Sequence, residues 1–204
     1  MRGRNDILAD IRANKPKFTA PAPAVPNYDD HYPSDAAGLQ ARFIEVLEKM
    51  GGAWAEPEAN ESLEATMRRA LADKLDANSL IASNVREIKG NRRVHADDTP
   101  ASLHDVDVAV LRARFGVAET GTVCFTEAEL TVNAVAYLAQ HLVVLLDPAT
   151  IETNLHRAYQ RDDYKNARYT VFHTGPSATA DIEGVLVRGA QGVRSLTVIP
   201  TPTV

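Results

Sequence analysis

Two short segments of this sequence combine glycines with carboxylate and hydroxyl side chains, the residue types that bind ligands or transfer protons. In the first, residues 115–122, Glu119 and Thr120 lie between Gly116 and Gly121. Glycine adopts backbone conformations that other residues avoid, so this loop can hold its polar side chains on a constrained turn. It is either a ligand or catalytic loop or a tight connection whose polar side chains satisfy its own backbone.

The second segment, residues 173–183, follows a strand-like run. We expect it to open a helix at the carboxyl end of the sheet, where open α/β folds bind ligands. Hydroxyl groups and free N–H groups at a helix start suit an anion or a carbonyl oxygen. Asp181 and Glu183 would lie in the first turn, where they complement the helix dipole but repel a phosphate. The alternative is a well-capped helix that binds nothing.

Both segments are expected to face one shared cleft at the carboxyl edge of the sheet, because two such loops are costly to specify if neither meets a ligand. Glu119 is the candidate for acid/base chemistry. Asp181 would orient the second turn. The candidate ligand-binding residues of the two segments are Thr120, Gly121, Gly175, Pro176, Ser177, Thr179 and Asp181.

Sequence features that hold cofactors or metals are absent. There is no G-x-G-x-x-G dinucleotide motif, no G-x-x-x-x-G-K-[ST] phosphate loop and no G-x-S-x-G nucleophile elbow. Cys124 is the single cysteine, so the chain cannot supply the four ligands that an iron–sulfur cluster normally takes. The six histidines have no paired metal-ligand spacing. The sequence therefore predicts no cofactor and no metal.

Composition narrows the class of partner. The 204 residues are enough for one globular domain with a continuous core. A net charge of −5 argues against binding to nucleic acid by bulk electrostatics. No stretch approaches the ~20 apolar residues of a membrane span, and no apolar signal-peptide core follows Met1. We therefore expect a cytoplasmic protein with no membrane span and no nucleic-acid partner.

The elements that would position these loops begin after a separate N-terminal region. Residues 1–14 are predicted to form a helix with Ile7, Leu8 and Ile11 on one face, packed on a distant part of the domain or on a partner; a frayed tail is the alternative. Five of the eleven prolines fall within residues 15–35, which predicts an extended arm. Residues 36–204 then form the α/β domain.

Within that domain, helical and strand-like patterns alternate. Apolar spacing predicts helices over residues 39–50 and 63–75, the second capped by Asn60, and further helices over 151–159 and 182–189. Short β-branched or apolar runs predict strands at 79–82, 106–111, 122–125, 142–146, 169–172 and 196–199. The alternation indicates βα units and hence a mainly parallel sheet with helices on both faces.

The two glycine-containing segments also resemble those of a known family. Residues 116–122, GVAETGT, are similar to the loop G-[IV]-A-E-T-G-T of lactate utilisation protein C, the LUD-domain family. Residues 174–183, TGPSATADIE, are similar to its signature [ST]-G-P-S-x-T-A-D-I-E. The resemblance covers roughly residues 36–200. It implies a Rossmann-like α/β fold, like that of the ribose-phosphate isomerase, glucosamine-phosphate deaminase and CoA-transferase group.

The resemblance also implies a function, with one departure. Family members act with two iron–sulfur partner proteins in oxidising L-lactate to pyruvate. Members often carry Gly-x-His-Gly-Pro after the signature, whereas residues 189–193 here are GAQGV, so no histidine can act as an acid or base there. Lactate oxidation must pass two electrons to an acceptor, and this chain has no residues to hold a redox centre.

Three functions remain open at this point. The first is a non-redox accessory or ligand-binding subunit of a lactate oxidation system with iron–sulfur partners. The second, by analogy of fold, is a free-standing isomerase, transferase or cycloligase that acts on a small anionic metabolite. The third is a structural scaffold, in which both loops are inert turns.

Overall fold

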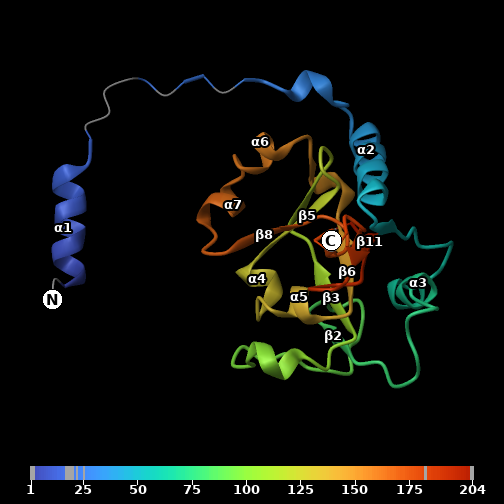
Figure 1. Cartoon of the computed structure of the whole chain (residues 1–204). Coiled ribbons are helices and arrows are strands. Elements are labelled where there is room, and N and C mark those ends of the chain that lie inside the picture. The colour runs from blue at the N-terminus through green and yellow to red at the C-terminus, as the bar shows by residue number, and fades with distance from the viewer. Residues whose placement is uncertain (1–2, 17–20, 22, 25, 182, 203–204) are drawn as a thin grey trace.

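A five-stranded parallel sheet forms the centre of the protein. The computed structural model describes residues 3–16, 21, 23–24, 26–181 and 183–202. The strand order is β1-β11-β6-β3-β2, and every neighbouring pair is parallel (Figure 1). The strands are β1 Ala53–Trp54, β11 Ser195–Pro200, β6 His141–Leu146, β3 Val108–Arg112 and β2 Ile81–Ser83. The predicted mainly parallel α/β fold is confirmed.

A second, mixed sheet of order β7-β4-β5-β8 covers part of one face. Its strands are β7 Ile151–Glu152, β4 Phe115–Val117, β5 Thr122–Thr126 and β8 Thr170–His173. β4 and β5 are antiparallel and form a hairpin, so residues 118–121 are its turn. β8 pairs antiparallel with β5. The predicted strand at 169–172 therefore exists, but it does not belong to the parallel sheet.

Two longer helices flank the parallel sheet: α2 Ala36–Lys49 and α3 Leu63–Ala70. Both were predicted, but the predicted cap of the second was wrong. Asn60 has a left-handed φ of 65°. Ser62 has the extended backbone that a cap needs, and its hydroxyl accepts a hydrogen bond from the Ala65 N–H.

The remaining helices that follow the N-terminal one are short, with one or two turns each. The α-helical ones are α4 Glu127–Leu130, α5 Val135–Leu138, α6 Leu155–Ala158 and α7 Asp162–Asn166, and the 3₁₀ turns are η1 Asp29–His31, η2 Pro100–Leu103 and η3 Pro148–Thr150. The helix predicted over residues 151–159 is present only in its second half, as α6. Its first half was wrong, because Ile151 pairs with Gly116 as part of β7.

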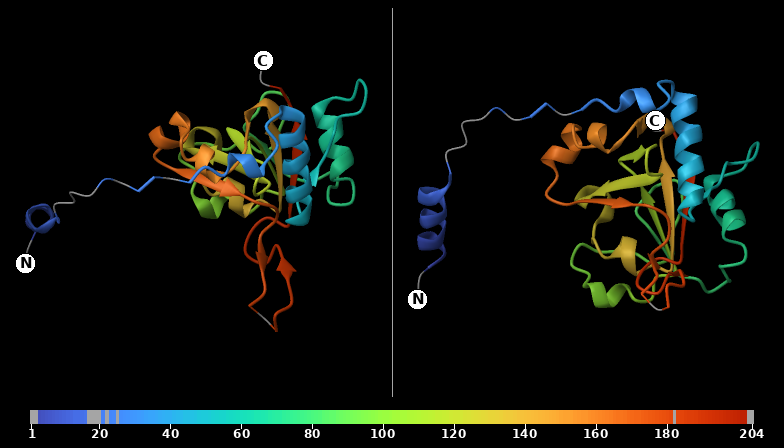
Figure 2. Two further views of the ribbon diagram at one scale, coloured as in Figure 1. Left: turned by 90° about the horizontal axis from the view of Figure 1, so that it is seen from above. Right: turned by 45° about the horizontal axis from the view of Figure 1, so that its top comes forward.

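A protruding hairpin replaces the helix predicted over residues 182–189. β9 Ala178–Thr179 and β10 Val187–Arg188 pair antiparallel and project from the domain (Figure 2). Glu183 and Gly184, at the tip, have φ values of 55° and 70°, which a right-handed helix does not allow. Asp181 and Glu183 therefore do not lie in a first helical turn, and Ile182 lies outside the described residues.

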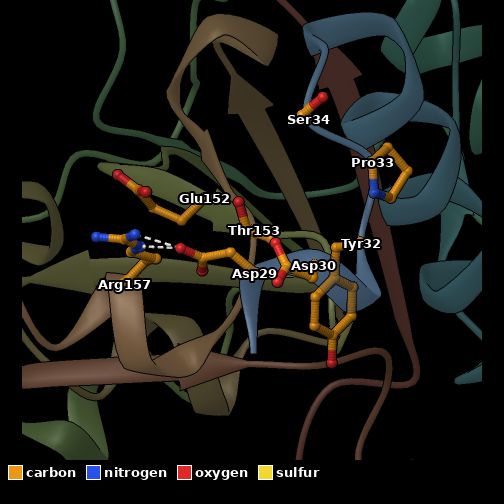
Figure 3. Close-up of a pocket in the computed structure, with 8 residues that line it drawn as sticks. All are labelled: Asp29, Asp30, Tyr32, Pro33, Ser34, Glu152, Thr153 and Arg157. Carbon is orange, nitrogen blue, oxygen red and sulfur yellow. Dashed lines mark hydrogen bonds and ion pairs between the residues drawn. The ribbon is translucent and has the colours of Figure 1, made fainter. Parts of the chain in front are cut away.

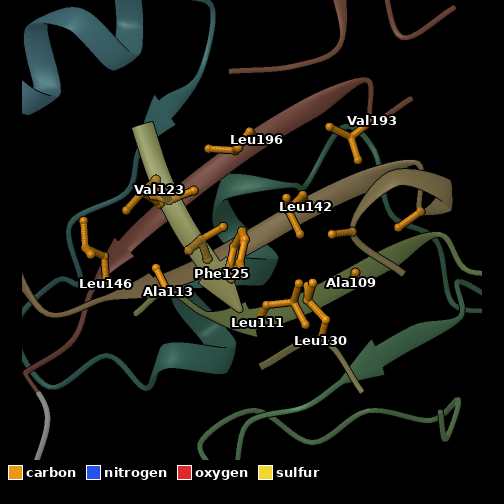
Figure 4. Close-up of a cluster of buried hydrophobic side chains, with 14 of the residues drawn as sticks. Ala109, Leu111, Ala113, Val123, Phe125, Leu130, Leu142, Leu146, Val193 and Leu196 are labelled. Carbon is orange, nitrogen blue, oxygen red and sulfur yellow. The ribbon is translucent and has the colours of Figure 1, made fainter. Parts of the chain in front are cut away.

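The core has a layer on each face of the parallel sheet. On one face, Leu111 and Leu142 pack with Phe125 of β5 and Phe43 of α2, in the cluster of Figure 4. On the other face, Val110, Val143 and Leu145 pack against Met67 and Leu71 at the α3 side. Strands that are covered on both faces have continuous apolar sequences. The central strands of the parallel sheet could be predicted for this reason.

The N-terminal helix α1, Arg4–Asn14, is present as predicted but stands apart from the domain (Figures 1 and 2). None of its residues is buried. The helix therefore does not pack on the domain, and packing on a partner, the other predicted possibility, stays a prediction. Within the described residues, no helix is long and apolar enough to cross a membrane.

Candidate functional site

The turn after β8 forms one wall of a small pocket, here called the signature pocket. Its volume is about 220 Å³. The walls come from β8 and its turn, from α5 and from the segment before β11. The lining residues are Ala136, Tyr137, Phe172, His173, Thr174, Gly175, Pro176, Ser177, Gln191, Gly192 and Val193. Three of the predicted ligand-binding residues, Gly175, Pro176 and Ser177, are therefore together at one pocket.

Backbone hydrogen bonds and close packing hold the walls of the signature pocket. The Ser177 N–H donates to the Val193 carbonyl at 2.9 Å, and the Gly189 N–H donates to the Ser177 carbonyl at 2.8 Å. Gly175 has a φ of +62°, and a Cβ there would lie 2.4 Å from the Met50 carbonyl oxygen at the end of α2. No other residue fits at this position without moving the turn or the helix.

His173 is the unusual residue of the pocket. Its side chain is buried, with 9% of the residue exposed, and its Nε2 has no hydrogen-bond partner within the described part of the chain. The ring lies 5.7 Å from that of Phe125 and 4.9 Å from that of Tyr137, centroid to centroid. Burial lowers the pKa of His173 to about 4, so the ring is neutral at neutral pH. Buried polar atoms without a partner are rare in folded proteins.

The pocket lies at the amino edge of the parallel sheet, not at the predicted carboxyl edge. Gly192 and Val193 lead into β11, and α5 leads into β6. The prediction was wrong because β8 belongs to the second sheet and runs antiparallel to β5. Its end therefore does not coincide with the carboxyl ends of the parallel strands.

The Glu119 loop is a neighbour of the signature turn but does not share its pocket. Thr120 donates a hydrogen bond to Thr122 at 2.7 Å, and Thr122 is hydrogen-bonded to Thr174. Gly121 has a φ of +61°, and a Cβ there would lie 2.3 Å from the Leu47 nitrogen of α2. Both turns thus pack against the end of α2 and are joined by hydroxyl groups.

The Glu119 carboxylate points into a different region. It accepts hydrogen bonds from the Tyr32 hydroxyl and from the Leu155 N–H at the start of α6, each at 2.9 Å. Burial is the main cause that raises the pKa of Tyr32, and its bond to Glu119 adds to it. The expected single cleft shared by Glu119 and Ser177 is therefore not present: Glu119 attaches the arm to the domain.

Thr179 and Asp181 lie on the protruding hairpin and do not line the signature pocket. The Thr179 hydroxyl donates to the Asp181 carboxylate at 2.5 Å. The structure thus separates the predicted site residues into three groups, at the pocket, at the loop beside α2 and on the hairpin.

Comparison with known proteins identifies the family. The family model for the LUD domain matches residues 47–199, more than half of the chain. The chain belongs to the LUD-domain family. A solved structure of a DUF162 family protein from Deinococcus radiodurans has a TM-score of 0.58 over 82% of this chain and 99% of that chain, at 16% sequence identity. At that identity the likeness supports the fold alone. None of the curated proteins matches the sequence.

The LUD domain has a second cavity where the arm meets it, here called the arm pocket (Figure 3). Its volume is about 670 Å³, and it is lined by Asp29, Asp30, Tyr32, Pro33, Ser34, Glu152, Thr153 and Arg157. Asp29 accepts hydrogen bonds from Arg157 and, at 3.0 Å, from the Asn154 amide, and the bond from Arg157 is the main cause that lowers the Asp29 pKa. The lining has three carboxylates, from two aspartates and one glutamate, and one guanidinium, from Arg157. This excess of negative charge makes the cavity unsuited to an anion.

A third cavity of about 330 Å³ lies at the carboxyl edge of the parallel sheet, where a ligand was expected. Three arginines line it, and each is paired with a carboxylate: Arg112 with Glu87, Arg114 with Glu129, and Arg161 with Asp163 and Glu152. We call these residues the carboxyl-edge cluster. No sequence motif indicated this cluster, and the one available signal was that Arg112 and Arg114 follow the predicted strand at 106–111.

The described residues contain no group of three or more His, Cys, Asp or Glu side chains that could hold a metal ion. Cys124 is buried as predicted, and burial raises the pKa of its thiol to about 12. A thiol with so high a pKa is a poor nucleophile at neutral pH. The polar chemistry best placed to meet a ligand in this LUD domain is therefore that of the signature pocket.

Proposed function

We propose that this LUD-domain protein is a cytoplasmic, non-redox ligand-binding subunit of an L-lactate oxidation system, and that iron–sulfur partner proteins carry the electrons. Membership of the family supports the lactate context. The conversion of lactate to pyruvate releases two electrons, and a single buried cysteine cannot bind a cluster to accept them.

The observation that supports the ligand-binding role is the Nε2 of His173 in the signature pocket, which has no hydrogen-bond partner within the described residues. A residue kept only for structure would be more stable as an apolar side chain of similar size, because a buried polar atom without a hydrogen bond is destabilising. Functional sites are where such destabilising features are retained. If the protein were a scaffold in which both turns bind nothing, a buried histidine with an unpaired nitrogen would have no explanation.

The free-standing enzyme is less well supported. Glu119, the candidate acid/base residue, is held by Tyr32 and the Leu155 N–H outside the signature pocket. His173 has a pKa of about 4, so it is a weak base at neutral pH. Neither group has the setting that an efficient proton-transfer catalyst needs.

Growth experiments test the proposed function. A strain that lacks the gene should fail to grow on L-lactate but should grow normally on pyruvate, since only the oxidation step depends on the protein. Wild-type protein should restore growth, and His173→Leu should not, although the variant accumulates to the normal level. Normal growth of the deletion strain on L-lactate would contradict the proposal.

Reconstitution separates the accessory role from the enzymatic one. The purified chain with a soluble electron-accepting dye should form no pyruvate from L-lactate. Addition of the co-purified iron–sulfur partners should restore the reaction. Sustained pyruvate formation by the chain alone would refute the accessory-subunit role.

A further inference from the structure

The walls of the signature pocket carry no ionised side chain at neutral pH. Its polar groups are the ring of His173, the hydroxyl groups of Thr174, Ser177 and Tyr137, and the amide of Gln191. His173 is neutral because burial lowers its pKa to about 4, and burial raises the pKa of Tyr137 far above neutrality. No lysine or arginine is among the lining residues. A buried carboxylate without a cation nearby is strongly disfavoured.

The polar groups that are present match a ligand with both a donor and an acceptor. The neutral imidazole of His173 offers one of its nitrogens as donor and the other as acceptor. Ser177 and Gln191 can each do both. Apolar contact comes from the rings of Phe172 and Tyr137. A volume of about 220 Å³ equals that of about seven water molecules, so the ligand or its inserted part is small.

From this lining we propose that the signature pocket binds a small uncharged polar molecule, a primary amide or the like, through His173 Nε2, and that it rejects the lactate anion. This inference rests on the proposed function and names the ligand class of the same site. The lactate oxidised by the system is then bound elsewhere, and this subunit recognises a different, neutral molecule.

The Tyr137 ring packs beside His173 in the wall of the signature pocket. The Nε2 atom is fully covered, so neither water nor a ligand reaches it without movement of a wall. The Tyr137 ring lies 4.9 Å from the imidazole and is 39% exposed. Its hydroxyl is hydrogen-bonded to that of Tyr169 at 2.7 Å, at the surface. Binding at Nε2 therefore requires one wall to move, and in this proposal that wall is the exposed Tyr137 ring.

A matched pair of probes tests the ligand class. Lactamide and L-lactate have nearly the same shape, but lactamide is uncharged. We expect lactamide to shift the ¹⁵N resonance of His173 Nε2 and to bind at least about tenfold more tightly than L-lactate at pH 7.5. The His173→Leu variant should lose lactamide binding, and its Tm should equal or exceed that of the wild type.

His141→Leu is the matched control. His141 is also partly buried, but its Nδ1 is hydrogen-bonded to the Ser195 hydroxyl at 2.8 Å and it does not line the pocket. This variant should keep lactamide binding and should have a lower Tm. A lower Tm of His173→Leu with unchanged lactamide binding would overturn the inference, because His173 would then be a structural residue.

The outcomes distinguish this inference from the proposed function. L-lactate binding as tight as lactamide binding, or no binding of lactamide, overturns the inference even if the deletion strain fails to grow on L-lactate. Normal growth of the deletion strain contradicts the lactate role even if lactamide binds at His173.

Discussion

The two edges of the parallel sheet differ in whether their polar side chains have partners. At the carboxyl edge, every arginine of the carboxyl-edge cluster is paired with a carboxylate. At the amino edge, the signature pocket contains the buried Nε2 of His173, which has no hydrogen-bond partner among the described residues. Open α/β folds usually bind ligands at the carboxyl edge. In this protein the arginines that line the cavity at that edge are already paired with carboxylates, and the group able to gain a hydrogen bond from a ligand lies at the other edge.

The largest expected effect concerns the backbone that builds the amino-edge pocket. Gly175→Ala should lower the free energy of unfolding by about 3 kcal/mol or more, because the residue combines a φ of +62° with a Cβ position 2.4 Å from the Met50 carbonyl oxygen. Gly184→Ala is the control: it has a φ of +70° and no atom within 4 Å, so we expect a loss of about 1 kcal/mol. Urea denaturation measures both, and equal losses would show that the close packing against α2 is unimportant.

The second effect is a pH dependence at His173. Its pKa is about 4 in the folded state, against about 6.5 unfolded, so protonation favours the unfolded chain. Well above pH 6.5 the histidine is neutral in both states, so its titration does not change the stability there. Below that pH it destabilises the fold, by about 3 kcal/mol at pH 4. The stability advantage of His173→Leu over the wild type should therefore grow from pH 7 to pH 4, and a constant difference in urea denaturation would contradict it.

The opposite edge should behave as an ordinary ion-pair network. Arg161→Met should lower the free energy of unfolding by about 2 kcal/mol at pH 7, since the guanidinium holds Asp163 and Glu152 and lies 4.6 Å from the Phe115 ring centroid. Arg161 holds the pKa of Asp163 below its usual range. That stabilisation is present above the unfolded pKa of about 4 and is lost as the pH falls through the folded pKa.

The difference between Arg161→Met and the wild type should therefore shrink below pH 4, whereas the difference at His173 grows as the pH falls. Lactamide binding should be unchanged in Arg161→Met, which differs from the expectation for His173→Leu. Loss of binding in this variant would indicate that the carboxyl edge contributes to the ligand site.

The smallest effects are expected at two partly buried polar positions, Ser177 and Glu119. Ser177→Ala should change the free energy of unfolding by less than about 1 kcal/mol but weaken lactamide binding. Glu119→Gln should change stability by about 1 kcal/mol, since it alters the bonds to Tyr32 and Leu155, and should leave lactamide binding unchanged. Calorimetric titration of both variants with lactamide tests whether the two loops act separately. An equal loss of lactamide binding in both would support the hypothesis that Glu119 and Ser177 face one cleft.

Several elements could be predicted because their signals are local. The helix α2 follows from apolar spacing that ends at Gly51, and the central strands follow from apolar runs covered on both faces. The hairpin at residues 178–188 could not be predicted in this way. Its apolar residues Val185 and Leu186 are exposed, so their helical spacing does not reflect a buried face.

The sequence by itself determined the parallel α/β class, the long helix α2, the burial of Cys124 and the glycines that the two turns need. The tertiary structure decided which edge of the sheet holds the pocket, because strand pairing placed β8 in the second sheet. It also separated Glu119 from Ser177 and left His173 Nε2 without a hydrogen-bond partner in the part of the chain that the structure describes. These are contacts between residues distant in the chain, and spacing along the sequence carries no information about which of them will form.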